Sequence, residues 1–535
     1  MTLRCITITS ILLGSSALSA LEFGQMGNVS AGIGGAGVAL RNSQWALYYN
    51  PALLAMSKRS GFAYSFGIGY KETNLSRAAS IDIDNLTDMP NQLAKLFSSG
   101  SSGSSAFQSI VQSAGGVDEL KKKPPAEIKD ALLSSLGNDP LSAALLAGLI
   151  TSVDPDNIGS LVDKFGNGTS GGGGGGGSGS PSDLPSLLTT LGSGISLQTG
   201  SDPSLNRFVT DMITLNEMIN KNDFSLSTQN GVVFNIGSKK KRGTISLGIM
   251  PSAFISATAK IDPTHNQVII KNNSQELKVT FTKDRITLTQ SSSQFDSHSI
   301  LSDQAKHQLH LSSIAIAEIP LGYGHLFETS LGDIALGLNA KYIFGTGYGY
   351  DKEGSFNTIT KDINPTFDGI AQTHTFGIDA GLAYAPRFAK NLTLGFVAKN
   401  LNMPKIKTDA KTGTMIKLNT QIRAGVSYGW LNDKIVLAGD IDLMPNDTIS
   451  LMRPKSQVAG GGILIDLKII DLRLGAMYDF RNNGDEGMIL TGGINLLGFF
   501  DIAVQSNLHL SHEIAGSGIA VPSYLLVKVG GGFSW

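Results

Sequence analysis

Apolar and polar residues alternate along many segments of the chain, most clearly in the last one, Tyr524 to Trp535, which reads YLLVKVGGGFSW. One set of alternate positions is apolar, small or aromatic and includes Phe533 and Trp535, whereas the other set includes Lys528. A period of two residues is that of a β-strand with two unlike faces. The segment therefore predicts a strand that turns one face to lipid and the other to a hydrated interior.

Strand patterns of this kind recur about fourteen times, each over roughly ten residues or more, the length that a tilted strand needs to cross a bilayer. They lie approximately at 61–70, 225–238, 243–261, 311–327, 332–350, 371–386, 391–402, 417–430, 434–444, 454–466, 469–481, 486–496, 498–509 and 521–535. In one of them Ile435, Leu437 and Ile441 share a face, and Asp440 and Asp442 point the other way.

The connections between these segments distinguish a soluble β-sandwich from a membrane barrel, because strands alternate in both folds. Tight links lie at 239–242, 328–331, 387–390, 431–433, 467–468 and 497, and longer ones at 71–224, 262–310, 351–370, 403–416, 445–453 and 510–520, with 482–485 as an exception. This order places tight turns on one rim and loops on the other. It predicts an all-β fold, a transmembrane antiparallel β-barrel of about fourteen strands with its tight turns in the periplasm.

The first long link, 71–224, is expected to form a helical, Gly-rich extracellular insertion. Helix-like pieces lie at 118–136, 141–152, 184–192 and 203–221. The run Gly171 to Gly177, flanked by serine and threonine, has the composition of a flexible linker. The second long link, 262–310, is polar and partly strand-like, which predicts a hairpin above the membrane.

Residues 1–20 have the three parts of a secretory signal peptide: Arg4, an apolar run, and small residues that permit cleavage after Ser19 or Ala20. A membrane anchor is the alternative, but the apolar run is too short to span a bilayer as a helix. Cys5 is the only cysteine and lies in this segment. We therefore expect an exported chain without disulfides, thiolate metal sites or cysteine nucleophiles.

Charge and hydropathy exclude two further classes of protein. The 535 residues include 42 basic and 43 acidic side chains, which gives no support for nucleic-acid binding. No uninterrupted stretch of about 18 apolar residues follows the signal segment, so membrane-spanning helices are not expected.

A glycine motif near the N-terminus resembles a nucleotide-binding fingerprint only in spacing. Gly32, Gly34 and Gly37 satisfy G-x-G-x-x-G. A dinucleotide site also needs an acidic residue about twenty positions further on. Between Glu22 and Glu72 there is no Asp or Glu, so we predict no nucleotide cofactor.

Catalytic and metal sites are not expected either. His307 and His310 are spaced i, i+3, as are His509 and His512, but both pairs lie at strand–loop borders and lack the fixed helical spacing of zinc motifs. Solvated loop histidines are the simpler interpretation. No triad-like arrangement accompanies the serines, so the sequence predicts no catalytic residue, no metal, no cofactor and no enzyme.

The N-terminal segment also carries a family resemblance. GIGGAGVAL and NPALLA, within residues 28–55, resemble the start of FadL-type outer-membrane transport proteins and their PorV-like relatives. Segments 381–404, 421–430 and 435–443 look like the TraF-like conjugal-transfer family of this barrel group. The resemblance covers 28–70 and about 311–535, and the insertions between these parts match neither pattern.

The resemblance implies a plug, or hatch, inside the barrel at residues 21–58. Its motif residues would be Gly32, Gly34, Gly35, Gly37, Asn50, Pro51 and Ala52. The implied organisation is 1–20 signal peptide, 21–58 hatch, 59–70 first strand, 71–224 insertion and 225–535 remaining barrel, with 262–310 as a long polar outer loop. The terminal Phe533 and Trp535 resemble the signal read by the barrel assembly machinery, which implies the outer membrane of a Gram-negative bacterium.

Ten charged residues fall on the predicted lumenal face of the strands. They are Lys341, Asp379, Lys399, Arg423, Asp440, Asp442, Arg473, Asp479, Asp501 and Lys528. Their mixed signs predict a network that pairs internally and anchors the hatch, whereas a selective pore lining would favour one sign.

Two functions remain open from the sequence. The resemblance implies a barrel that contacts outer-membrane lipid and that binds and passes small hydrophobic molecules. The alternative is a non-transporting scaffold associated with conjugation or secretion machinery. A soluble enzyme is a distant third possibility.

Overall fold

The computed structural model describes residues 22–57, 60–75, 81–82, 85–86, 103–136, 143, 146–147, 150–151, 158–159, 162–163, 195–198, 203–237, 243–272, 275–282, 285–359, 370–408, 414–482, 487–508, 510–513 and 520–535. The predicted signal peptide, the glycine run and the predicted helix at 184–192 lie outside these residues. Of the predicted helix at 141–152, isolated residues alone are described.

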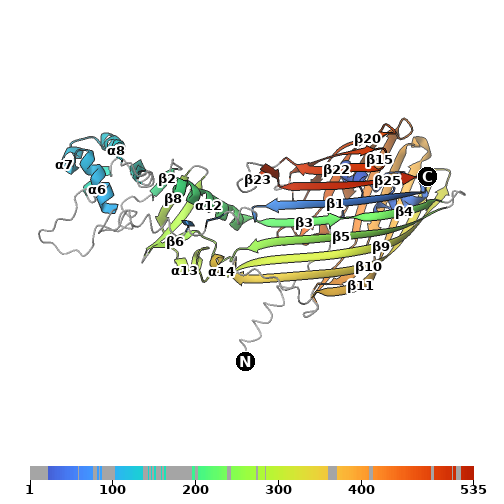
Figure 1. Ribbon diagram of the computed structural model, residues 1–535, viewed down its shortest axis with the longest axis horizontal. Coiled ribbons are helices and arrows are strands. Elements are labelled where there is room, and N and C mark those ends of the chain that lie inside the picture. Colours follow the sequence, from blue (N-terminus) through green and yellow to red (C-terminus); the bar gives the residue numbers. More distant parts are fainter. Residues whose placement is uncertain are drawn as a thin grey trace, which may run out of the picture.

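The main body of the chain is one closed antiparallel sheet (Figure 1). Its strands are β1 (Gly61–Thr73), β3 (Asp223–Gln229), β4 (Gly231–Gly237), β5 (Thr244–Lys260), β9 (His307–Glu328), β10 (Gly332–Gly354), β11 (Ala371–Pro386), β12 (Leu392–Lys399), β15 (Gln421–Trp430), β16 (Ile435–Asp442), β19 (Val458–Asp466), β20 (Ile470–Asp479), β21 (Met488–Leu496), β22 (Phe500–Asn507) and β25 (Tyr524–Ser534). Strands β3 and β4 both lie between β1 and β5 and are two parts of one strand interrupted at Asn230. The sheet is therefore a 14-strand barrel, which confirms the predicted fold.

The first and last strands close the barrel. Strand β25 pairs with β1 from Gly61 opposite Ser534 to Lys71 opposite Tyr524. This seam confirms the predicted position of the last segment, since pairing along both edges leaves no open sheet edge at β25.

The two faces of the wall have the predicted polarity. On β20, Leu472 and Leu474 are 42% and 68% exposed, whereas the intervening Arg473 is 2% exposed. On β25, Val529 and Phe533 are exposed, and Lys528 is fully buried in the lumen. A continuous outward band of large apolar side chains is what a barrel embedded in a bilayer requires.

One side of the wall is much taller than the other. Strands β9 and β10 contain 22 and 23 residues, whereas β12 and β16 contain 8 each. At roughly 3.3 Å per residue, the tall strands are about 75 Å long, more than a membrane needs. They extend beyond the lipid-facing part toward a separate outer module (Figure 1).

The outer module combines the two long links, 71–224 and 262–310, with part of the link at 351–370. It contains helices α6 (Gly103–Ser113), α7 (Val117–Leu120), α8 (Pro125–Ser134), α12 (Pro203–Asn220), α13 (Phe295–His298) and α14 (Phe356–Ile359), and a sheet in the order β2 (Ile195–Gln198), β8 (Arg285–Gln290), β7 (Gln275–Thr282), β6 (Ile269–Asn272). Leu120, Leu132, Phe208, Val279 and Leu288 belong to its single apolar core. Within the described part of the chain, no helix is both long and apolar enough to cross a membrane.

Two sequence predictions about this module were wrong in detail. The predicted helix at 118–136 is two helices, because proline cannot continue a helix and Pro125 starts a new one at its first position. The predicted hairpin in 262–310 is part of a four-stranded sheet, whose edge strand β2 comes from the first long link.

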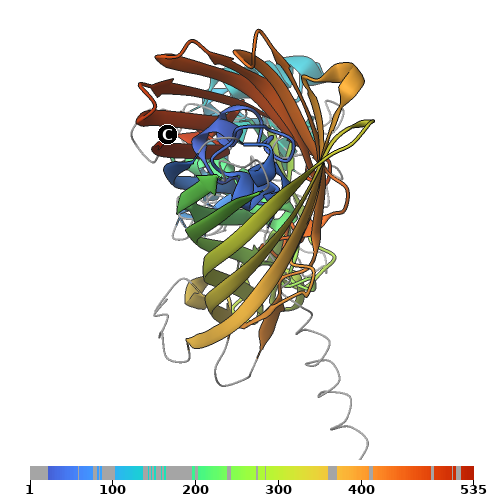
Figure 2. The same cartoon turned by 90° about the vertical axis from the view of Figure 1, so that its right-hand side faces the viewer.

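Residues 22–57 lie inside the barrel, at the end that carries the tight turns (Figure 2). This hatch contains α2 (Asn28–Gly32), α3 (Ala46–Tyr49) and the 3₁₀ helix η1 (Pro51–Ala55). Two loops also fold into the lumen from the opposite end. One contains β13 (Lys405–Lys407) and β14 (Met415–Lys417), and the other contains β17 (Asn446–Asp447) and β18 (Lys455–Ser456). The short elements η3 (Arg387–Ala389), β23 (Leu510–Glu513) and β24 (Ala520–Pro522) complete the described chain.

Candidate ligand cavity and hatch

A wall carboxylate holds the glycine-rich segment of the hatch. Asp440 points inward from β16, and its Oδ2 accepts hydrogen bonds from the backbone N–H groups of Gly37 (2.7 Å) and Val38 (2.9 Å). Hydrogen bonds to an ionised acceptor are stronger than neutral ones. This predicted lumenal residue therefore fixes the hatch to the barrel.

The Asn-Pro-Ala segment has a physical role in seating the hatch. Asn50 Oδ1 accepts from the Ala52 N–H (3.1 Å) and caps η1, whose first residue is Pro51. The Asn50 amide donates to the carbonyls of Val38 (2.9 Å) and Leu382 (3.0 Å), so one buried side chain joins two parts of the hatch to strand β11. The barrel wall facing this segment carries glycines. They are Gly324, Gly337 and Gly381, whose added Cβ atoms would lie 2.0–2.9 Å from atoms of residues 50–55.

The G-x-G-x-x-G segment also contacts the barrel wall. Gly34 has φ +69, and a Cβ there would lie 2.3 Å from the Ala476 carbonyl oxygen. The Thr491 hydroxyl accepts from the Gly34 N–H (2.9 Å) and donates to the Gly32 carbonyl (3.1 Å). Gly35 also has positive φ, at +79. These glycines let the backbone approach the wall, as glycine alone can do at such positions.

Cations from the wall lie over two aromatic rings of the hatch, Phe23 and Tyr48. The Arg423 guanidinium lies 4.0 Å from the centre of the Phe23 ring, and Lys399 Nζ lies 4.7 Å from it. Lys399 Nζ also lies 3.4 Å from the centre of the Tyr48 ring. Cation–π contacts are strengthened where water is excluded. These two predicted lumenal cations therefore contribute to holding the hatch.

The remaining lumenal charges mostly pair within the wall. The ion pairs are Lys341 with Glu318 (2.8 Å) and Asp379 (3.1 Å), Arg423 with Asp442 (2.7 Å), and Arg473 with Asp501 (2.6 Å). Asp479 instead accepts from the Ser456 hydroxyl (2.8 Å), and Lys528 donates to the Gln229 carbonyl (2.8 Å). The structure thus brings six of the ten predicted residues into ion pairs, and gives uncharged partners to the other four, Lys399, Asp440, Asp479 and Lys528.

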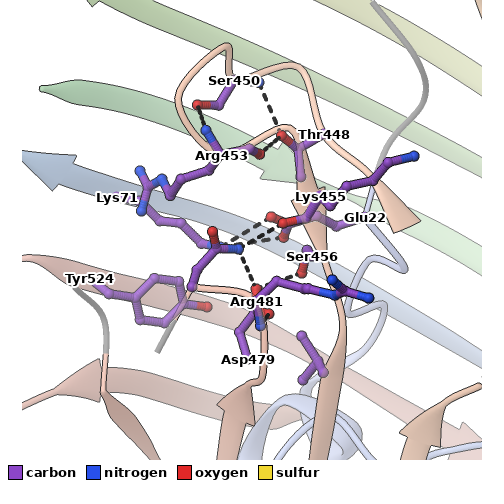
Figure 3. Close-up of polar contacts among 12 residues, drawn as sticks. Glu22, Lys71, Thr448, Ser450, Arg453, Lys455, Ser456, Asp479, Arg481 and Tyr524 are labelled. Atoms are coloured by element: carbon purple, nitrogen blue, oxygen red, sulfur yellow. Dashed lines mark hydrogen bonds and ion pairs between the residues drawn. The ribbon is translucent and has the colours of Figure 1, made fainter. Parts of the chain in front are cut away.

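A cavity of about 1190 Å³, part of it open to solvent, lies between the hatch and an inward-folded loop. Its floor includes Glu22 to Gln25, and its roof includes Thr448, Ile449, Ser450 and Arg453 (Figure 3). One wall is apolar and is formed by Val458, Met477, Ile489, Tyr524 and Leu526, which cluster on the inner faces of four strands. A second cavity of about 490 Å³ adjoins it and shares Glu22, Gly24, Gln229 and Phe254.

Charges around the larger cavity are compensated. Glu22 pairs with Lys71 (3.1 Å), and Arg453 donates to Asp223 (2.7 Å). An ionic ligand would have to compete with these pairs, and the lining carboxylates Asp440 and Asp479 already accept hydrogen bonds from backbone N–H and hydroxyl groups. The combination of apolar wall and paired charges suits an uncharged, mainly apolar ligand.

Several residues of this site could not be predicted from the sequence. Asp223 and Arg453 are 230 positions apart, and no local pattern connects a loop arginine to a strand aspartate. Glu22 and Lys71 were missed for the same reason. Tyr524 could have been found, since strand alternation places it on the same face as Lys528.

The described histidines of the first pair have partners within the outer part of the chain. His307 is buried, where its Nε2 lies 2.8 Å from the Ile300 carbonyl, and His310 lies beside Asp351. His509 lies outside the described residues. Among the residues that the structure describes, no group of three or more His, Cys, Asp or Glu side chains is placed to hold a metal ion.

Comparison with known proteins gives one family match. The family model described as "F plasmid transfer operon, TraF, protein" matches residues 156–442, more than half of the chain. No curated protein matches the chain. Among solved structures, the chain is similar to the Pseudomonas putida toluene transporter TodX (10% identity, 97% of this chain and 99% of that chain, TM-score 0.39), the Ralstonia pickettii toluene transporter TbuX (11%, 96% and 98%, 0.37) and a Pseudomonas aeruginosa FadL homologue (9%, 97% and 98%, 0.31).

Proposed function

The chain belongs to the family of the F plasmid transfer operon protein TraF, and we propose that this member binds small hydrophobic molecules in its lumen and passes them across the outer membrane. The observation that carries this proposal is the apolar inner wall at Met477, Ile489 and Leu526, beside a cavity closed below by the hatch. The interior of a water-filled barrel is polar. An apolar patch inside the lumen therefore supports an apolar ligand.

The apolar outer band supports the proposed location, because such a surface is stable only in lipid. Passage would then require the hatch contacts at Asp440 and Asn50 to be exchanged for others, since the hatch blocks the periplasmic end of the cavity.

The test is mass spectrometry of hydrophobic molecules that co-purify with the detergent-solubilised protein. Ile489→Trp would fill the cavity from β21, because Ile489 faces the lumen and is 1% exposed. Ile494→Trp on the same strand is the matched control, because Ile494 faces outward and is 38% exposed. We expect the bound molecule to be lost in the first variant and kept in the second. No bound molecule in the natural protein, together with no uptake defect in a deletion strain, would refute transport.

A scaffold in conjugation or secretion is the second candidate, and the outer module is the observation that favours it. Neither cavity is lined by a described residue of the helices α6, α7, α8 or α12, which pack into their own core with both long links. A scaffold predicts that removing the module abolishes transfer or secretion, whereas Ile489→Trp has no effect on it.

A further inference from the structure

The loop between β16 and β19, residues 443–457, crosses the lumen; it is called the strap below. In the barrel order, β3 lies seven strands from β16 in one direction and six from β19 in the other, so it is on the opposite wall. The tip of the strap nevertheless bonds to Asp223 on β3. A loop that bonds to the far wall must span the diameter of the barrel.

One buried carboxylate holds this tip. Arg453 donates to Asp223 Oδ2 from both Nε (2.7 Å) and Nη2 (2.5 Å), and the Ser450 hydroxyl donates to Oδ1 (2.9 Å). Asp223 is 1% exposed and Arg453 5%. Thr258, from the neighbouring strand β5, donates to Oδ1 as well (3.1 Å). The contact is charge-assisted and shielded from water, so it is stronger than a surface ion pair.

The root of the strap is fixed independently of its tip. The Ser456 hydroxyl (2.8 Å) and the Gln457 N–H (3.0 Å) both donate to Asp479 on β20. Nearer the tip, Ile449 belongs to an apolar cluster with Ile316 and Ile416. The tip residues Leu451 and Met452, beside the latch, are 45% and 37% exposed. Loss of the Asp223 contact would therefore remove the ionic anchor of the tip, and the root would stay in place.

We infer that the strap is the outer gate of the lumenal cavity, latched by Arg453 and Asp223. Thr448, Ile449, Ser450 and Arg453 form the roof of the cavity, as the hatch forms its floor (Figure 3). With both contacts made, the strap and the hatch lie at the two ends of the cavity and narrow its opening to solvent. When the contact between Arg453 and Asp223 breaks, the strap opens and molecules enter the cavity from outside. The hatch stays in place during this step. The chemical class of the molecules that enter rests on the proposed function, whereas the opening and closing of the strap does not.

The test measures access to the cavity without any cargo. Ser227→Cys places a reporter thiol on β3 in the cavity lining, in a chain whose only cysteine is Cys5. A membrane-impermeant maleimide is added to outer-membrane vesicles, and its reaction with residue 227 is followed by peptide mass spectrometry. Arg453→Ala should raise the labelling rate at least about tenfold, equal to about 1.4 kcal/mol of opening free energy.

Lys455→Ala is the matched control, because Lys455 pairs with Asp447 inside the strap and is 52% exposed. It should leave the labelling rate unchanged. The reversal Asp223→Arg with Arg453→Asp should restore slow labelling, whereas either substitution alone should not. Folding of each variant is checked by its heat-dependent mobility in gels. A folded Arg453→Ala variant labelled at the natural rate, or a double reversal no slower than the single variants, would overturn the gate. If Arg453→Ala speeds labelling but no hydrophobic molecule is bound to the natural protein, the proposed function is refuted and the gate is not.

Discussion

Asp440→Asn is the sharpest test of how the lumenal charges act. If they anchor the hatch, this nearly isosteric change must loosen Gly37 and Val38, whose N–H groups both bond to Asp440 Oδ2. If they only line a pore, the hatch should not respond. Asp440 is 7% exposed, so water cannot readily replace the lost contact.

The size of the effect follows from the two hydrogen bonds. A bond to a charged acceptor contributes about 1.5–3 kcal/mol and a neutral one about 0.5–1.5 kcal/mol, so each bond weakens by about 1 kcal/mol. The other carboxylate oxygen, Oδ1, is buried without a hydrogen-bond partner among the described residues. The hatch contact should therefore weaken by about 2 kcal/mol or more, roughly a thirtyfold increase in local opening.

Hydrogen exchange of the Gly37 and Val38 amides measures this opening in the detergent-solubilised protein. Asp471→Asn is the control, since Asp471 is an inward aspartate that pairs with Arg473 at 3.5 Å and has no hydrogen bond to the described hatch. We expect faster exchange in the first variant alone. Unchanged exchange in a folded Asp440→Asn protein would refute the anchoring role.

Three further predictions concern the hatch and the outer module. Asn50→Ala removes three hydrogen bonds and should cost about 3 kcal/mol, whereas Asn50→Ser keeps the helix cap and should cost less, as read from hydrogen exchange over 46–57. Gly337→Ala places a Cβ 2.2 Å from the Ala52 nitrogen, so residues 22–57 should become sensitive to protease while the barrel still assembles. Burial raises the pKa of Asp262, but hydrogen bonds from Thr264, the Lys306 N–H and His265 outweigh it and hold this pKa below its usual value. The lowered pKa stabilises the folded module fully at pH values above the unfolded pKa of about 4, and this stabilisation is lost as the pH falls further. The melting temperature of the module should therefore be lower at pH 3 than at pH 6. Asp262→Asn should reduce this difference.

The barrel could be predicted almost completely from the sequence. Alternation at Leu472, Arg473 and Leu474 assigns the faces of a strand without knowledge of its neighbours, because side chains on a strand point to opposite sides with a period of two. Link lengths then order the strands, and closure pairs the last strand with the first. These features are local or follow from chain order, so a single sequence contains them.

Contacts across the lumen could not be predicted in this way. Asp223 and Arg453 meet because two strands lie on opposite walls of a closed barrel, and β2 pairs with β8 because two distant links leave the same rim. Even for Asp440, alternation indicates that the carboxylate faces inward but not that it binds the hatch backbone. The sequence by itself determined the barrel, its polarity and which charges face inward. The tertiary structure decided which partners those charges meet, because closing the barrel brings residues hundreds of positions apart within hydrogen-bond distance.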